Sequence, residues 1–119
     1  MMSMRTIEVY QLLQRKILVT RESASAVREA IESSISAEGE VALDFSGIDA
    51  VTPSFVDEIL GMIDDARASS SRREVRVVFS HAPTPLSAKY LAIGKRHGAT
   101  MSQLSSDAWE IKNASTVGA

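Results

Sequence analysis

The chain contains no cysteine among its 119 residues. Disulfide bonds, thiolate catalysis and cysteine-ligated zinc are therefore excluded. Proline and glycine are also scarce, with 3 and 6 residues. A low-complexity chain is usually rich in both, so this class is not indicated. No apolar run approaches the length that crosses a membrane, and the N-terminus lacks the apolar core of a signal peptide. We therefore expect a cytoplasmic protein.

The chain also lacks an excess of positive charge. It has 13 lysines and arginines against 15 aspartates and glutamates, a formal net charge of −2. Nucleic acids and anionic membranes attract basic surfaces, so we expect neither as a partner. The phosphate-binding patterns G-x-x-x-x-G-K-[ST] and G-x-G-x-x-G do not occur, and we expect no cofactor. What remains is an ordinary globular composition, 45% hydrophobic and 24% charged, in a chain long enough for one core.

The most informative stretch runs from residue 40 to residue 66. Residues 41–45 form a short apolar run that stops at Ser46-Gly47, a pattern typical of a buried strand ended by a turn. Thr52 and Pro53 then supply a hydroxyl N-cap and a proline at the first helical position. This stretch therefore predicts a central strand, a turn and a helix.

The predicted helix is amphipathic. At 100° per residue, the apolar side chains gather on one face: Phe55, Ile59, Met62, Ile63 and Ala66, flanked by Val56 and Leu60. The opposite face carries Ser54, Asp57, Glu58, Gly61, Asp64 and Asp65. A glycine inside a helix costs about 1 kcal/mol relative to alanine, so Gly61 indicates a packing or docking role. We expect this second face to be an exposed acidic stripe.

The segment DFSGIDAVTPSF, continuing into DEILG, resembles the signature of a STAS-like domain family of unknown function. That family is similar in pattern to the bacterial anti-sigma factor antagonists, in which an Asp-Ser-Ser-Gly-Leu stretch opens a helix and its second serine is phosphorylated by a partner kinase. Asp44 and Gly47 match the strand end, and Ser54 falls at the phosphorylated serine. Thr52, Pro53 and Phe55 differ from the corresponding Asp, Ser and Gly.

The resemblance implies a regulatory, non-enzymatic bacterial protein. The implied partner is a histidine-kinase-like ATPase or an anti-sigma factor. The implied phosphorylation site is Ser54, with Thr52 as the alternative. The predicted partner-binding residues share the acidic helix face or the strand end before it: Asp44, Ser54, Asp57, Glu58, Gly61 and Asp65.

The remaining segments complete an α/β pattern. We expect a hairpin over residues 5–20 with its turn near Gln14-Arg15, or else one longer strand, followed by a helix over residues 21–35 capped by Thr20 or Ser23. Residues 75–79 are β-branched and aromatic and predict another central strand.

The C-terminal third repeats the Thr-Pro helix start. Thr84-Pro85 predicts a helix over residues 85–97 that ends at Gly98, with the cations at residues 95–97 suited to its last turn. We expect Met101 and Leu104 in a loop or short turn, and an edge strand over residues 108–112. Residues 113–119 are predicted to be a disordered tail.

The element order predicts a single α/β domain over residues 1–112. Strands separated by helices favour parallel pairing. The STAS resemblance implies a mixed or partly parallel sheet of four to five strands with helices mainly on one face.

Two other functions remain open. One is sensing of a small molecule or nucleotide, which would require a pocket at the strand ends near Asp44, Ser80 and His81. The other is a hydrolase with Ser54 as nucleophile, which would require His81 or His97 beside it, although no G-x-S-x-G elbow is present. We expect no metal site, because carboxylates along one helix face seldom form a closed cage.

Overall fold

A five-stranded sheet in the order β1-β3-β5-β7-β6 forms the framework of the computed structural model, which describes residues 5–14, 16–18 and 21–114. The elements, in chain order, are β1 (Arg5–Glu8), α1 (Val9–Leu13), β2 (Ile17–Leu18), α2 (Arg21–Ser25), α3 (Arg28–Glu38), β3 (Glu40–Asp44), β4 (Ala50–Val51), α4 (Pro53–Ser69), β5 (Glu74–Ser80), α5 (Ala88–Arg96), β6 (Ala99–Ser105) and β7 (Ala108–Ala114). Strands β2 and β4 form a separate parallel pair.

The sheet is mixed. Strands β1, β3 and β5 are parallel, and β7 runs antiparallel between β5 and β6. Leu43 of β3 lies opposite Ile7 of β1 and Phe79 of β5. Val77 of β5 lies opposite Ile111 of β7. The predicted α/β class and the mixed sheet of four to five strands are confirmed, the observed number of strands being five.

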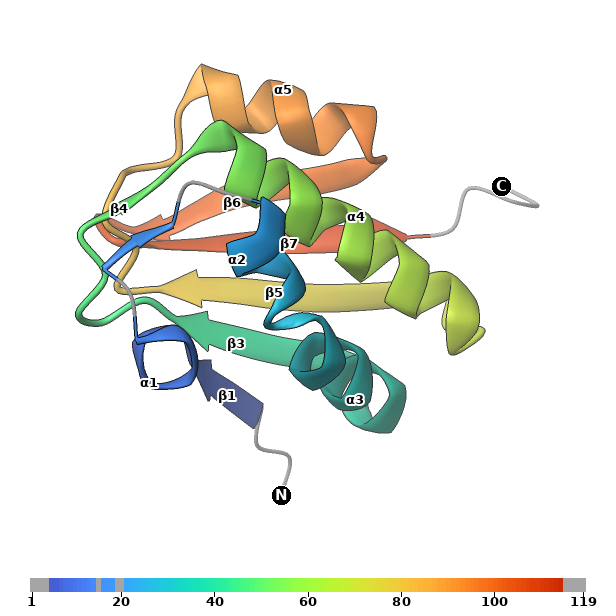
Figure 1. Ribbon diagram of the computed structural model, residues 1–119. Coiled ribbons are helices and arrows are strands. Elements are labelled where there is room, and N and C mark those ends of the chain that lie inside the picture. The colour runs from blue at the N-terminus through green and yellow to red at the C-terminus, as the bar shows by residue number, and fades with distance from the viewer. Residues whose placement is uncertain (1–4, 15, 19–20, 115–119) are drawn as a thin grey trace.

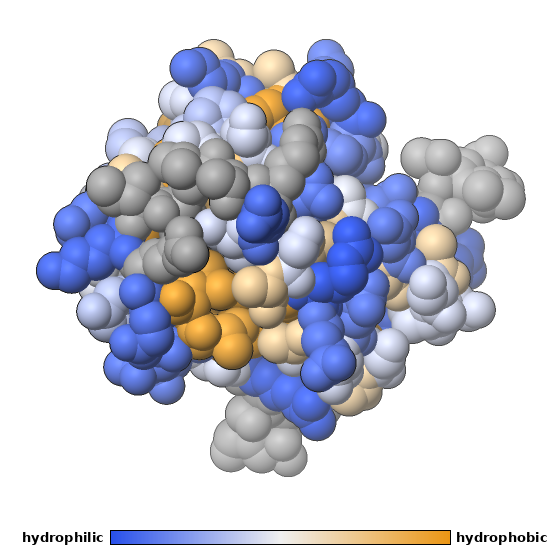
Figure 2. All heavy atoms as spheres, viewed as in Figure 1, coloured by the Kyte–Doolittle hydropathy of each residue, from blue (hydrophilic) through white to orange (hydrophobic). Residues whose placement is uncertain are grey.

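Helices α2, α3, α4 and α5 cover one face of the sheet, and α4 lies in the middle of this layer (Figure 1). Seen from the same side, most of the described surface is hydrophilic, and hydrophobic residues gather mainly in one area at the lower left (Figure 2). Alternate residues of the strands point into the core, as the burial of Val41, Leu43, Val75 and Val77 shows. The apolar face of α4 meets them, and its predicted members are all buried: Phe55, Val56, Ile59, Leu60, Met62, Ile63 and Ala66.

The opposite face of the sheet carries alternating charges across three strands. Arg76 of β5 lies 3.7 Å from Glu40 of β3 and also binds Glu110 of β7. Lys112 of β7 is 4.0 Å from Glu110. Opposite charges on neighbouring strands attract one another, and charged side chains of this kind keep the face suited to water.

The N-terminal hairpin prediction is wrong. Strand β1 pairs in parallel with β3, and the chain then turns into the single-turn helix α1, which ends at Gln14 with a φ of 57°. The two leucines that interrupt the alternation, Leu12 and Leu13, belong to α1: Leu12 is exposed, whereas Leu13 packs against the core. Arg15 and Thr20 lie outside the described residues.

The helix predicted over residues 21–35 is two helices. The backbone N–H of Val27 bonds to the carbonyl of Ala24, three residues back, which tightens the chain between α2 and α3. This turn allows both Ala24 and Val27 to be fully buried. Helix α3 then continues to Glu38, and Gly39 ends it with a φ of 75°, a conformation that glycine adopts without strain.

The second Thr-Pro pair does not begin a helix. The backbone N–H of Leu86 donates to the Gln103 side chain at 3.2 Å, and α5 starts only after Ser87. The loop prediction for Met101 and Leu104 is also wrong, since both lie in β6.

The last strand differs from the prediction in place and length. Strand β7 lies inside the sheet rather than at its edge, and it extends through Asn113 and Ala114. Asn113 is buried, with hydrogen bonds to Arg67 and His97. Residues 115–119 of the predicted tail lie outside the described part of the chain. Among the described residues, no helix is both long and apolar enough to span a bilayer.

Truncation of Ile59 tests the packing of α4. Ile59 is fully buried in the core, so Ile59→Ala removes apolar contacts and leaves a cavity. We expect the free energy of unfolding to fall by about 2–5 kcal/mol in denaturant titrations. Leu12→Ala is the control, because Leu12 is 49% exposed and its truncation should change stability by less than about 0.5 kcal/mol. Equal losses in the two variants would contradict the packing described.

Candidate functional site

The start of α4 is built as the sequence predicts. Thr52 caps the helix, its hydroxyl oxygen accepting the backbone N–H of Phe55 at 3.4 Å. Pro53 occupies the first helical position. Ser54 follows on the outer side of this first turn and is exposed. The cap therefore holds the Ser54 hydroxyl at the surface, near the positive end of the helix dipole.

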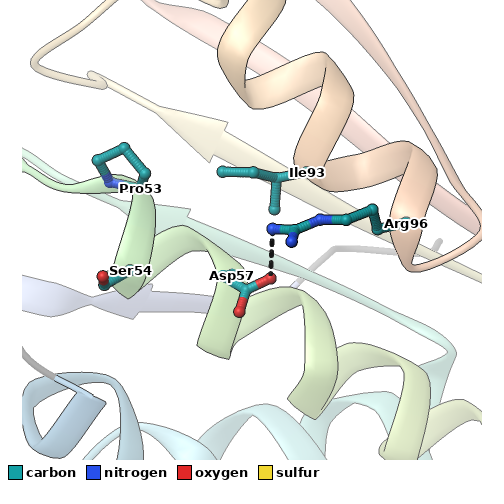
Figure 3. A pocket seen from close by; sticks show the side chains of 5 residues that line it. All are labelled: Pro53, Ser54, Asp57, Ile93 and Arg96. Atoms are coloured by element: carbon teal, nitrogen blue, oxygen red, sulfur yellow. Dashed lines mark hydrogen bonds and ion pairs between the residues drawn. The ribbon is translucent and has the colours of Figure 1, made fainter.

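A shallow depression of about 190 Å³ lies between the start of α4 and α5. Its lining residues are Pro53, Ser54 and Asp57 of α4, with Ile93 and Arg96 of α5. Figure 3 shows the Asp57 carboxylate pointing across to the Arg96 guanidinium, while Ser54 lies nearer the helix start, apart from that pair. The wall formed by α5 is therefore cationic and the wall formed by α4 carries a hydroxyl and a carboxylate.

Asp57 joins the two helices. Its Oδ1 accepts a hydrogen bond from the Nε2–H of His97 at 2.8 Å and lies 3.3 Å from the Arg96 guanidinium. The Asp57 and His97 side chains are only 26% and 24% exposed. The cationic end of α5, which sequence reasoning explained by the helix dipole alone, therefore also contacts α4.

Gly61 lies one turn after Asp57 and faces His97 at the end of α5. A Cβ atom at Gly61 would lie 3.8 Å from Cε1 of His97, which is an ordinary van der Waals contact. The structure therefore places a neighbouring helix beside Gly61, but the packing does not require a glycine at this position. The prediction that Asp57 and Gly61 lie on an exposed face is wrong, because α5 packs over that part of α4.

The other acidic residues of α4 differ in exposure. Glu58 is partly buried. Asp64 receives a hydrogen bond from Arg67 at 3.0 Å. Asp65 is 66% exposed and lies 3.7 Å from Arg28 of α3. Arginine side chains of the same chain therefore contact several carboxylates of the predicted acidic stripe. A role of Glu58 and Asp65 in partner binding stays a prediction.

Asp44 forms a second polar group at the carboxyl ends of β3 and β5. Its Oδ1 accepts hydrogen bonds from the backbone N–H and hydroxyl of Ser46, at 2.9 and 2.8 Å, and from Nδ1–H of His81 at 3.0 Å. Partial burial by itself raises the pKa of the Asp44 carboxyl. The hydrogen bonds from Ser46, together with the bond and charge of His81, outweigh this effect and lower the pKa below 3.8.

His81 reaches Asp44 from a left-handed backbone conformation with a φ of 53°, and its side chain is 61% exposed. Of the three residues named for a small-molecule site, Asp44 and His81 are thus in contact and Ser80 lies beside Asp44 in the sheet register. A ligand there stays a prediction.

Neither histidine is placed to activate Ser54. His81 binds Asp44 and His97 binds Asp57, and within the described residues no hydrogen bond joins Ser54 to either ring. The described residues also contain no group of three or more metal-ligating side chains. The arrangement offers an exposed hydroxyl beside a charged depression, which suits recognition by another molecule.

The residues that build the start of α4 fall within a family match. Residues 23–63 match a STAS-like domain of unknown function. The STAS-like match covers α3, β3, β4 and α4 as far as Ile63, and it confirms the resemblance noted in the sequence. No curated protein and no solved structure gives a significant match.

The pH dependence of stability should change when Asp44 is replaced by asparagine. Because the folded-state pKa of Asp44 is lowered, its carboxylate stabilises the native state above the unfolded-state pKa. That stabilisation disappears as the pH falls through the folded-state value. Wild type should therefore exceed Asp44→Asn in unfolding free energy by about 1 kcal/mol near pH 6, and the difference should shrink as the pH falls below 3.8.

Denaturant titrations across this pH range measure the effect, with Asp65→Asn as the control for a carboxylate that is 66% exposed. A difference between wild type and Asp44→Asn that stayed constant down to the lowest pH would contradict the assigned hydrogen bonds.

Gly61→Ala should be tolerated. The added methyl group would make an ordinary contact with His97 at 3.8 Å, and alanine favours the helix. We expect unfolding free energy to rise by up to about 1 kcal/mol. Gly61→Leu is the matched larger variant, since its side chain must displace His97, and it should lower stability. A destabilising Gly61→Ala would show that α5 packs more tightly on α4 than described.

Proposed function

We propose that this domain is a non-enzymatic regulatory module that binds a protein partner at the start of α4, with Ser54 as its phosphorylation site. The observation that carries the proposal is an exposed hydroxyl, presented by a capped helix start, at the rim of an interhelical depression. The STAS-like match over residues 23–63 supports it, because Ser54 lies within the match and at the position that the resemblance assigns to the phosphorylated serine.

The surface around Ser54 suggests how a partner is held. Arg96 is 69% exposed although it contacts Asp57, so its guanidinium can also receive an acidic group of the partner. Ile93 and Pro53 add apolar surface within the same depression. This favours a partner with both apolar and acidic groups over a purely basic one. By resemblance, that partner is a histidine-kinase-like ATPase or an anti-sigma factor.

A phosphate on Ser54 would change this surface without touching the core. It adds about 1.5 to 2 negative charges near a helix N-terminus, where the dipole favours them. The new charge repels Asp57 and attracts Arg96, so it competes for the guanidinium that Asp57 now holds at 3.3 Å. The depression, in which Asp57 and Arg96 balance each other, then becomes net negative, and the partner's affinity changes.

Site mapping tests the modification. The purified domain is incubated with ATP and lysate of the source cells, recovered, and mapped by mass spectrometry. We expect phosphate on Ser54, lost in Ser54→Ala but kept in Ser33→Ala, which alters an exposed serine on α3. Phosphate on Thr52 would contradict the assignment, and so would wild type without phosphate. Thr52→Ala should instead cost about 1 kcal/mol of stability through the lost cap.

Charge reversal tests the binding surface. A partner protein that binds the wild-type domain should no longer bind Ser54→Asp or Arg96→Glu, because both substitutions make the depression more acidic. Lys89→Glu is the matched control for Arg96→Glu, because Lys89 is an exposed cation that also belongs to α5 but lies outside the depression. A partner retained by Ser54→Asp and Arg96→Glu would place the binding surface elsewhere.

A further inference from the structure

Strand β6 forms one edge of the five-stranded sheet. Its inner side pairs with β7, and within the described part of the chain no strand pairs with its outer side. It extends over seven residues, and most of its side chains are exposed. The backbone N–H and C=O groups along such an edge can bind another strand.

Strand β6 carries little of the usual protection against such pairing. Its sequence, ATMSQLS, contains no charged residue, proline or glycine. The irregularity in its pairing with β7 lies between Gln103 and Ser105, close to its end. The other edge, β1, is four residues long and carries Arg5 and Glu8. The two edges therefore differ, and β6 is the one suited to pairing.

Exposed apolar side chains lie beside the same edge. Leu104 of β6 is 51% exposed and Leu91 of α5 is 44% exposed. Gly94 lies about one helical turn after Leu91. Because Gly94 has no side chain, α5 can pack directly against Met101 of β6. Figure 1 shows α5 running alongside β6 at this border of the molecule. The two elements at this edge thus each carry one exposed leucine.

We propose that two copies of the chain associate by antiparallel pairing of their β6 strands. A strand without charge can pair with itself without bringing like charges together, and a two-fold axis gives both copies the same contacts. With the axis at Ser102, the middle residue of β6, Thr100 of each copy lies opposite Leu104 of the other. The two sheets become continuous, with both helical layers on one side.

The interface consists of one strand and the margin of one helix, which is small for a stable complex. We expect a dissociation constant on the order of 10–100 µM, and hence a concentration-dependent dimer. This surface is separate from Ser54, so the dimer and the proposed partner site can be tested independently of each other.

Sedimentation velocity from about 1 to 500 µM measures the association. Ser102→Lys should weaken the dimer at least about tenfold, because two lysines would face each other across the axis. The exposed position of Ser102, with Glu110 as its neighbour on β7, accommodates a lysine in the monomer. Ser33→Lys, the same substitution on exposed α3, should dimerise like wild type.

A mixing experiment tests the register. Ser102→Glu alone should weaken the dimer in the same way, whereas an equal mixture of Ser102→Lys and Ser102→Glu should recover it, because opposite charges then meet at the axis. Thermal melting checks that each variant folds. If the carboxylate beside Glu110 prevents Ser102→Glu from folding, Leu104→Lys serves as a second disrupting variant, because it places a charge opposite Thr100 of the other copy, and it too should weaken the dimer.

Two results would overturn the proposal. Wild type that stays monomeric to about 500 µM does not pair through β6 at all. A dimer that Ser102→Lys and Leu104→Lys leave unchanged forms through another surface.

Discussion

The arrangement of the domain depends on one row of aromatic side chains in its core. Phe55 lies 6.4 Å from Phe45, Phe45 lies 4.9 Å from Phe79, and the row continues through Trp109 to Tyr90 at 4.8 and 5.3 Å. Aromatic residues make up only 5% of the chain, so a large part of this small set is gathered in one contact row. The row anchors α4 and α5 to the same sheet, because Phe55 belongs to α4 and Tyr90 to α5.

Polar contacts complete this anchorage where the two helices meet. Asp57 receives a hydrogen bond from His97, and the carbonyl of His97 accepts one from Asn113 of β7. Asn113 in turn accepts a hydrogen bond from Arg67 of α4 at 2.8 Å. Partly buried polar groups that satisfy one another in this way fix the helices relative to the sheet. The depression beside Ser54 exists because α5 is held against the first turns of α4.

Helix α4 and the central strands could be predicted because their signals are local. The Thr52 cap, Pro53 and the spacing of apolar residues such as Ile59 act within a few residues of chain, and the structure confirms each of them. The N-terminal segment has weaker signals. Residues 9–13 form a helix rather than part of a hairpin, since β1 gains parallel pairing with β3, a contact that alternation along the chain does not encode.

The sequence by itself determined the α/β class, the amphipathic α4 with its cap, and the exposed position of Ser54. Each follows from the chain's periodicity or from contacts between near neighbours. Only the tertiary structure decided that α5 covers Asp57 and Gly61, and that β7 lies inside the sheet with β6 at its edge. The residues joined by the Asp57–His97 bond are 40 positions apart. Whether a helix face meets water or another helix depends on how separate elements dock, and no local pattern carries that information.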